Sequence, residues 1–126
     1  MKEHVFTDKA PAPIGPYSQC VKVGSMYYFS GVIPLSTDGQ SIIGGEIVEQ
    51  TQQVIANINA LLQACGLTAN NVVKTTVFLK NMNDFAAMNA VYAEFFGESK
   101  PARSTVEVSR LPKDVLVEIE MIATAS

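Results

Sequence analysis

One segment of the chain has a strongly helical pattern, and it constrains the fold more than any other feature. Between residues 47 and 65, apolar and small side chains recur at steps of three and four: Ile47, Thr51, Val54, Ile55, Ile58, Leu61, Leu62 and Cys65. This spacing gathers them on one face of an α-helix, and such a face must pack against another element. Gly66 follows where a glycine commonly ends a helix.

The other segments favour strands and one further helix. β-rich runs cover 17–23, 26–33, 72–80, 103–109 and 115–123, and residues 4–7 can add a short edge strand. A second helix, capped by Asn83 or Asp84 and ending at Gly97, has an apolar face made of Phe85, Met88, Tyr92, Phe95 and Phe96. The predicted order is β-β-β-α-β-α-β-β, an α/β (α+β) fold that forms one domain over residues 1–126.

This element order also predicts the topology of the sheet. The two strand–helix–strand units indicate parallel pairs with right-handed crossovers, and hairpins at both ends of the chain add antiparallel pairs. Two helices can cover one face of such a mixed sheet. Several strands carry apolar residues on both faces, so we expect the second face to be buried in a homo-oligomer.

Composition excludes several classes of function. The 126 residues are 48% hydrophobic and 17% charged, and nine basic against twelve acidic residues give a net charge of −3. This balance disfavours binding to nucleic acid or to anionic membranes. Neither a signal peptide nor a membrane span is apparent, so we expect a cytoplasmic protein. Cys20 and Cys65 are far apart in sequence and are expected to be reduced, without a disulfide or a zinc site.

Familiar catalytic motifs are missing from the sequence. His4 is the one histidine, and its place near the N-terminus is typical of a solvated surface residue. A Ser–His–Asp triad therefore has no good candidates, and the metalloprotease, P-loop and dinucleotide-binding motifs do not occur. We expect neither a metal nor an organic cofactor.

The C-terminal block PARSTVEVSR offers a different kind of site. On a strand, Arg103 and Thr105 project side by side, on the same face as Glu107 and Ser109. A guanidinium and a hydroxyl in this arrangement can bind a small carboxylate. The alternative is an ordinary polar strand face in which Arg103 forms a salt bridge with Glu107 or another neighbour, and spacing alone favours that alternative.

Other candidates also have two interpretations. Glu118 shares a strand face with Glu120 among apolar neighbours, so it is either a proton-handling carboxylate with a raised pKa or one of a solvated pair. Ser30 and Gly31 mark either close approach of a ligand or a β-bulge. Two further residues complete the candidate set. Asn89 interrupts the apolar face of the second helix and is either a residue at the rim of that face or a ligand donor, and Tyr17 is a pocket wall or core.

Long stretches of the sequence resemble one known family. APAPIGPYSQ, FSGVIP, NVVKTTVFLKNMNDFAAMN, YAEFF and PARSTVEVSRLP…VEIEMIA are similar to the RidA/YjgF family, also called L-PSP endoribonucleases or translation initiation inhibitors. The resemblance implies a chorismate-mutase-like (YjgF) fold with two helices on one side of the sheet. It also implies a homotrimer with clefts between subunits, and hydrolysis of 2-iminobutanoate and 2-iminopropanoate without a cofactor.

The same resemblance suggests a role for each candidate residue. Arg103 matches the arginine that binds the substrate carboxylate, and Glu118 matches the glutamate thought to position the attacking water. Further matches line the cleft: Tyr17, Ser30, Gly31 and Asn89. Thr105 stands where many bacterial members have cysteine, which argues against a thiolate mechanism but retains a hydroxyl donor. The loop 97–100 is also shorter than in some relatives.

These matches predict an enamine/imine deaminase that acts on a small 2-imino acid. One alternative is a regulatory protein of amino-acid or purine metabolism that senses a keto acid or another small carboxylate in the same cleft. An endoribonuclease or translation inhibitor is a second alternative, disfavoured by the net charge and the single histidine. A chaperone-like role is a third, and no residue identifies it.

Overall fold

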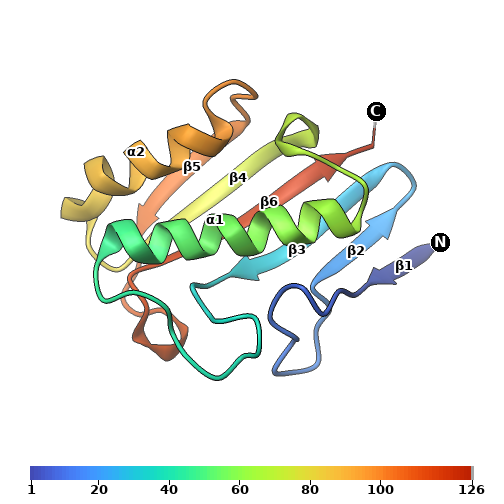
Figure 1. Ribbon diagram of the computed structural model, residues 1–126. Coiled ribbons are helices and arrows are strands. Elements are labelled where there is room, and N and C mark those ends of the chain that lie inside the picture. Colours follow the sequence, from blue (N-terminus) through green and yellow to red (C-terminus); the bar gives the residue numbers. More distant parts are fainter. Residues whose placement is uncertain (126) are drawn as a thin grey trace.

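The computed structural model describes residues 1–125, which form one six-stranded mixed sheet with two helices against one of its faces (Figure 1). The strands are β1 (Lys2–Val5), β2 (Cys20–Val23), β3 (Met26–Val32), β4 (Val72–Leu79), β5 (Ala102–Glu107) and β6 (Val117–Thr124). The helices are α1 (Ile47–Ala64) and α2 (Phe85–Phe96). The predicted order of elements and fold class are confirmed.

The order of strands across the sheet differs from the expected pairing. It is β1-β2-β3-β6-β4-β5, with β6 antiparallel to both β3 and β4. The expected hairpin between the last two strands is wrong, because the crossover through α2 places β5 parallel to β4 at the edge of the sheet. The crossover through α1 leaves a gap one strand wide between β3 and β4, and β6 fills it.

The helix-covered face of the sheet contains the core. In β6, alternate residues such as Val117 and Ile119 are fully buried, and α1 contributes Val54, Ile58 and Leu62, each 0% exposed. The expected end of α1 is confirmed, because Gly66 adopts a left-handed backbone with φ +72°. In that conformation the Leu67 N–H donates to the Leu62 carbonyl at 2.9 Å, which closes the last turn.

Both cysteines are free, and the fold brings them together although they are distant in sequence. Cys20 lies on the covered face of β2, and Cys65 follows the last residue of α1. The two thiols lie close together, and burial raises the pKa of Cys20 to about 12. A thiol with so high a pKa is a poor nucleophile at neutral pH.

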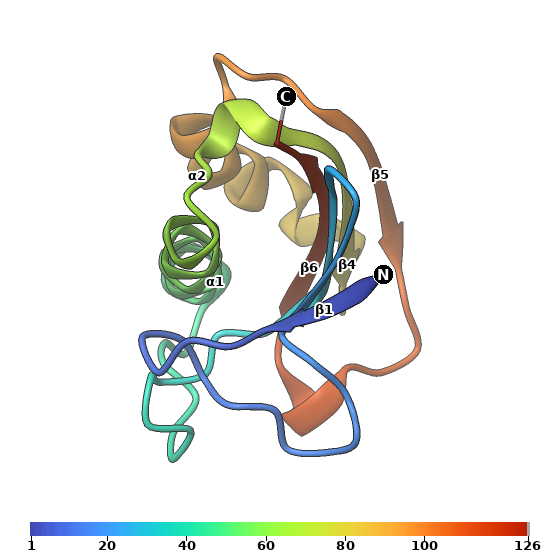
Figure 2. The ribbon, with the colours of Figure 1, turned by 90° about the vertical axis from the view of Figure 1, so that its right-hand side faces the viewer.

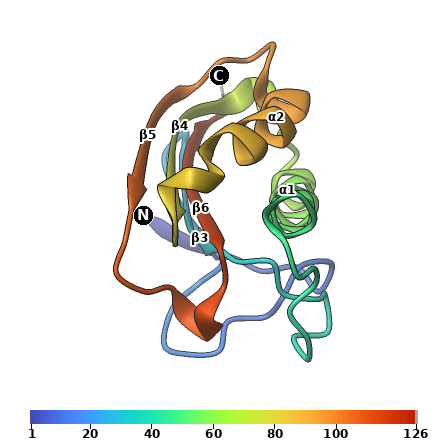
Figure 3. The ribbon, with the colours of Figure 1, turned by 90° about the vertical axis from the view of Figure 1, so that its left-hand side faces the viewer.

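No helix or loop of the described residues 1–125 lies over the centre of the opposite face of the sheet (Figures 2 and 3). It mixes apolar side chains with charged ones: Val23, Tyr28, Val106 and Ile122 accompany Lys74, Glu118 and Glu120. Tyr28 is 46% exposed and Val106 is 41% exposed. Within residues 1–125, no helix is long and apolar enough to cross a membrane.

The packing of α1 gives a direct test of the fold. Val54→Ala should lower the free energy of unfolding by about 2 kcal/mol, because it removes buried carbon and leaves a cavity. Val48→Ala is the matched control on the same helix, and its side chain is 41% exposed. It should change the free energy by less than about 0.5 kcal/mol. Urea unfolding at one fixed protein concentration measures both; equal losses would contradict the described packing.

Candidate functional site

Arg103 projects from β5 toward α2, on the helix-covered side of the sheet. Its guanidinium donates a hydrogen bond to the Asn89 side-chain oxygen at 2.6 Å. The same group stacks over the rings of Tyr92 and Phe85, at 4.7 and 5.4 Å from their centroids. The Tyr92 hydroxyl is in turn 2.7 Å from the buried Thr75 hydroxyl on β4. One amide and two aromatic rings therefore orient the guanidinium.

The alternative salt bridge of Arg103 with Glu107 does not form. Among residues 1–125 the one ion pair joins Arg110 and Asp114, at 2.8 Å. The Glu107 carboxylate instead accepts the Met82 backbone N–H at 2.8 Å. Most of the N–H groups of Arg103 thus remain available, and the side chain lines a surface hollow between α2 and the loop at residues 97–101.

Thr105 lies two residues further along β5, on the same face as Arg103. Its hydroxyl oxygen is buried and has no hydrogen-bond partner within the described residues 1–125, a property it shares with Thr51. Buried polar atoms in proteins nearly always have a partner. A hydroxyl that lacks one beside an unpaired guanidinium is what a carboxylate-binding site requires.

Glu118 occupies the uncovered face of β6, where its cross-strand neighbour on β4 is Phe78. The carboxylate lies directly over Gly31 of β3, so a Cβ at residue 31 would overlap it. The pairing of β3 with β6 is irregular between Phe29 and Val32, which marks a β-bulge. The β-bulge interpretation of Ser30–Gly31 is confirmed. The glycine admits a close approach by Glu118, and approach by a ligand stays a prediction.

The environment of Glu118 favours its neutral form. Burial raises the pKa of this carboxyl above its usual value of 4.5, and the negative charge of Glu120 raises it further. A carboxyl group with a raised pKa can accept and return a proton at a pH nearer to neutral than an exposed one can.

Tyr17 and Ser30 lie near Gly31, the glycine that the Glu118 carboxylate approaches. The Tyr17 hydroxyl accepts the Ile14 backbone N–H at 3.3 Å, and the Ser30 hydroxyl donates to the Ser18 carbonyl at 2.6 Å. Tyr17 is half exposed, so the pocket-wall interpretation holds. His4 is also close by: its ring lies 2.6 Å from the Ser18 hydroxyl, and it shares a hollow with Tyr17 and Ser30.

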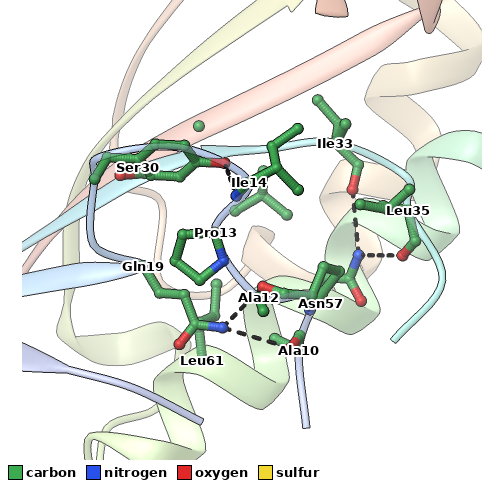
Figure 4. Close-up of a pocket in the computed structure, with 14 residues that line it drawn as sticks. Ala10, Ala12, Pro13, Ile14, Gln19, Ser30, Ile33, Leu35, Asn57 and Leu61 are labelled. Atoms are coloured by element: carbon green, nitrogen blue, oxygen red, sulfur yellow. Dashed lines mark hydrogen bonds between the residues drawn. The ribbon is translucent and has the colours of Figure 1, made fainter. Parts of the chain in front are cut away.

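Tyr17, Ser30 and Gly31 also border a cavity that extends beneath the proline-rich loop at residues 10–14 (Figure 4). Gln19 holds this loop by donating to the Pro11 carbonyl at 2.8 Å, and Asn57 of α1 holds the chain after β3 by donating to the Leu35 carbonyl at 2.9 Å. Sequence reasoning missed both amides. Their only signal is a polar side chain within an apolar stretch, and that signal does not reveal their carbonyl partners.

The predicted site residues form two separate groups. The arginine group consists of Arg103, Asn89 and Thr105 with the rings beneath them, and it faces α2. The glutamate group consists of Glu118, Gly31, Ser30 and Tyr17, and it lies at the uncovered face. Because the two groups occupy opposite sides of the sheet, one chain does not bring Arg103 and Glu118 to the same ligand. Residues 1–125 also contain no group of three or more potential metal ligands among His, Cys, Asp and Glu.

Comparison with known proteins identifies the class to which this fold and these residues belong. Residues 7–125 match the family model described as endoribonuclease L-PSP. A RutC family protein of Pyrococcus horikoshii is 60% identical over 123 residues, which cover 98% of each chain. The chain therefore belongs to the L-PSP family, the family also known by the names YjgF and Rid.

Two relatives carry more specific descriptions. A Salmonella typhimurium protein named 2-iminobutanoate/2-iminopropanoate deaminase is 48% identical over 126 residues, which cover 98% of each chain. The chain in the structure of E. coli TdcF with bound serine has 42% sequence identity to this one. The two structures superpose with a TM-score of 0.92, and the match covers 98% of this chain and 99% of the TdcF chain.

The raised pKa of Glu118 predicts a pH-dependent effect on stability. A carboxyl whose folded-state pKa is raised favours folding below pH 4.5, and this contribution disappears as the pH rises through the folded-state value. Glu118→Gln lacks this dependence. The stability of the variant relative to the wild-type protein should therefore increase between pH 4.5 and neutral pH. Urea unfolding at several pH values measures the difference, with Glu94→Gln on exposed α2 surface as a control; a flat difference would contradict the assignment.

Proposed function

We propose that the chain hydrolyses small 2-imino acids, such as 2-iminobutanoate and 2-iminopropanoate, to 2-keto acids and ammonia. The observation that carries this proposal is the Arg103 guanidinium, oriented by Asn89 and without a carboxylate partner in residues 1–125, beside the unpaired Thr105 hydroxyl. Such a pair suits the carboxylate that every 2-imino acid carries. The Salmonella relative, named for this reaction, supports the choice of substrate.

The separation of the two groups requires a site shared between copies of the chain. Arg103 and Glu118 point to opposite sides of one sheet, so they can act on one small molecule only if different subunits supply them. The uncovered face exposes large apolar side chains, Val23, Tyr28 and Val106, beside its charged ones. We therefore propose a homotrimer, in which each cleft takes the arginine group from one subunit and the glutamate group from the next.

In this cleft, Arg103 and Thr105 bind the carboxylate and fix the position of the imine carbon. Glu118 accepts a proton from water as the oxygen attacks that carbon, which forms a carbinolamine. Glu118 then passes this proton to the nitrogen. As the C–N bond breaks and the C=O bond forms, Glu118 accepts the proton of the carbinolamine hydroxyl, and ammonia leaves with that proton as ammonium. One water is consumed, and no electrons are exchanged with a cofactor.

The proposed hydrolysis needs only a small reduction of the activation barrier. Imines hydrolyse in water without a catalyst, and each tenfold acceleration requires a reduction of the barrier by about 1.4 kcal/mol. A fixed carboxylate and a positioned general base commonly supply several such factors. A strong nucleophile is therefore unnecessary, and Cys20 and Cys65, whose pKa values are raised, do not offer one.

A carboxylate sensor is the second candidate, because the arginine group would serve it equally well. The structure of E. coli TdcF contains bound serine, which is also a small carboxylate. A simple receptor for an anion, however, gains nothing from placing Glu118 near its ligand. RNA cleavage, suggested by the family's descriptive name, receives little support from a net charge of −3 and a single histidine.

Substitutions at the two groups should affect different kinetic constants. Arg103→Ala should raise KM and lower kcat/KM by about a hundredfold or more, because it removes the carboxylate anchor. Glu118→Gln should lower kcat about a hundredfold and change KM little. Ammonia release from imines generated in situ measures both. Arg110→Ala, which removes an exposed arginine outside the site, is the control; wild-type rates in all three variants would exclude the proposed roles.

A shared site predicts that two inactive variants restore each other. Arg103→Ala and Glu118→Gln subunits, unfolded together in equal amounts and refolded, should recover about a quarter of wild-type activity, since half of the arginine groups and half of the glutamate groups remain intact and combine at random. Mixing the two proteins without unfolding is the control. Absence of recovery in refolded mixtures of normal size would contradict the assignment of the two groups to different subunits.

The proposed interface has its own test. Ile122→Glu places a charge at the centre of the uncovered face and should convert trimers to monomers in analytical ultracentrifugation, because burying an unpaired carboxylate is unfavourable. Ile43→Glu is the matched control, on an exposed loop where the isoleucine is 40% accessible. A wild-type protein that sediments as a monomer would contradict the trimer directly.

A further inference from the structure

We infer that Cys20 and Cys65 form an oxidisable pair, which a small-molecule disulfide converts to an intramolecular disulfide that ties strand β2 to the C-terminal end of α1. Both thiols are free in the structure, and they lie close together. Neither cysteine belongs to the arginine group or to the glutamate group. The pair is therefore a separate modification site, independent of the proposed hydrolysis.

The fold brings the two cysteines together from two different elements. Cys20 is the first residue of β2, and it pairs across the ladder with the buried Phe29, so its thiol lies on the helix-covered face of the sheet. Cys65 is the residue that ends α1. It packs against the hydrophobic core that contains Cys20. The end of the helix thus places one thiol over the strand that carries the other.

Lys22 gives independent support for this placement. It lies two residues after Cys20 on β2, so the two side chains share one face of the strand. Its ammonium group is 5.5 Å from the centroid of the Tyr27 ring on the neighbouring strand. Burial raises the pKa of Cys65, and the positive charge of Lys22 opposes that effect. Cys65 is therefore near both residues of the covered face of β2.

Hydrogen bonds fix the backbone on both sides of the pair. Cys20 lies between two strands, where it is paired with Val5 of β1 and Phe29 of β3. The Cys65 N–H donates to the Leu62 carbonyl at 3.0 Å in the last turn of α1. Two thiols held near each other by the fold react with one another at a high effective concentration. A disulfide within the chain is therefore favoured over adducts with two separate small molecules.

Unequal exposure sets the order of the two steps. Cys20 is 1% exposed, whereas Cys65 is partly exposed and so is the thiol that meets the reagent first. The Cys65 thiolate attacks one sulfur of oxidised glutathione, the S–S bond breaks, and one glutathione leaves and takes up a proton. Cys20 then loses its proton to solvent, attacks the Cys65 sulfur and releases the second glutathione. Two cysteines are oxidised, and one small disulfide is reduced.

Burial makes this exchange slow without making its product unstable. The raised pKa values of both thiols leave little thiolate at neutral pH, and the thiolate is the reactive form. Once formed, the disulfide restricts the unfolded chain between residues 20 and 65, and a crosslink over a segment of this length stabilises the folded state. The pair therefore records sustained oxidation rather than a brief pulse.

Mass spectrometry of the full chain tests the disulfide directly. The protein is first reduced, then incubated with excess oxidised glutathione, alkylated and analysed without reductant. We expect a chain that has lost two hydrogen atoms, takes up no alkylating agent and gives a peptide linking Cys20 to Cys65; dithiothreitol should restore both thiols. A chain that keeps two alkylatable thiols, or that accumulates glutathione on Cys65, would overturn the inference.

Single substitutions test the order of the steps. Cys20→Ser should accumulate one glutathione on Cys65, because the second thiol is missing. Cys65→Ser should react about tenfold more slowly or less, because the remaining thiol is buried. Cys20→Ala and Cys65→Ala replace the serine variants where a hydroxyl in the core prevents folding. Equal rates of glutathione uptake in the two folded variants would show that Cys65 is not the thiol that reacts first.

Thermal unfolding tests whether the disulfide ties the two elements together. The oxidised wild-type protein should unfold about 10 °C above the reduced one, because the crosslink restricts the unfolded chain. The Cys65→Ser variant, which lacks the pair, is the control and should be unaffected by the same treatment. Equal unfolding temperatures for the oxidised and reduced wild-type protein would contradict the inferred link between β2 and α1.

Discussion

Hydrogen bonding of β6 to β3 on one side and to β4 on the other is the interaction on which the rest of the structure depends. In this register Met121 faces Phe29 across one ladder, and Ile119 faces Val77 across the other. All four side chains are buried under the helices. The intervening Glu118 must then lie on the opposite face, over Gly31. A shift of one residue would exchange the two faces, bury both glutamates under α1 and remove the carboxylate from the candidate site.

Local patterns predicted the elements well, but not how distant strands pair. The period of α1, its end at Gly66 and the common face of Arg103 and Thr105 all follow from sequence spacing, and the structure confirms them. The expected hairpin between β5 and β6 does not form. The crossover through α2 places β5 beside β4 at the edge of the sheet, and β6 pairs with the other side of β4, so the two strands are neighbours in sequence but not in the sheet. The vacant position between β3 and β4 is a tertiary property, and no local pattern encodes it.

The candidate site was predictable as a set of residues and unpredictable as an arrangement. Alternation along β5 placed Glu107 on the same face as Arg103, which made their salt bridge the simpler expectation. In the structure a backbone N–H at Met82 binds that carboxylate, so the guanidinium turns to Asn89 and the rings of α2. Which donor the Glu107 carboxylate accepts from depends on the turn before α2, and spacing along one strand contains no information about it.

The charges of the proposed reaction explain why a carboxylate such as Glu118 can serve near an anionic substrate. A protonated imine carries a positive nitrogen beside the carbon that is attacked. Its approach would favour the charged form of Glu118 and so oppose the burial and the Glu120 charge that raise the pKa of this carboxyl. The keto-acid product has lost that nitrogen as ammonia. The product then presents only its carboxylate and a neutral carbonyl. Its attraction to Glu118 is therefore lost, whereas the interaction of its carboxylate with the Arg103 guanidinium is unchanged. The same carboxylate that attracts the substrate thus weakens the binding of the product, a selectivity that Arg103 alone cannot provide.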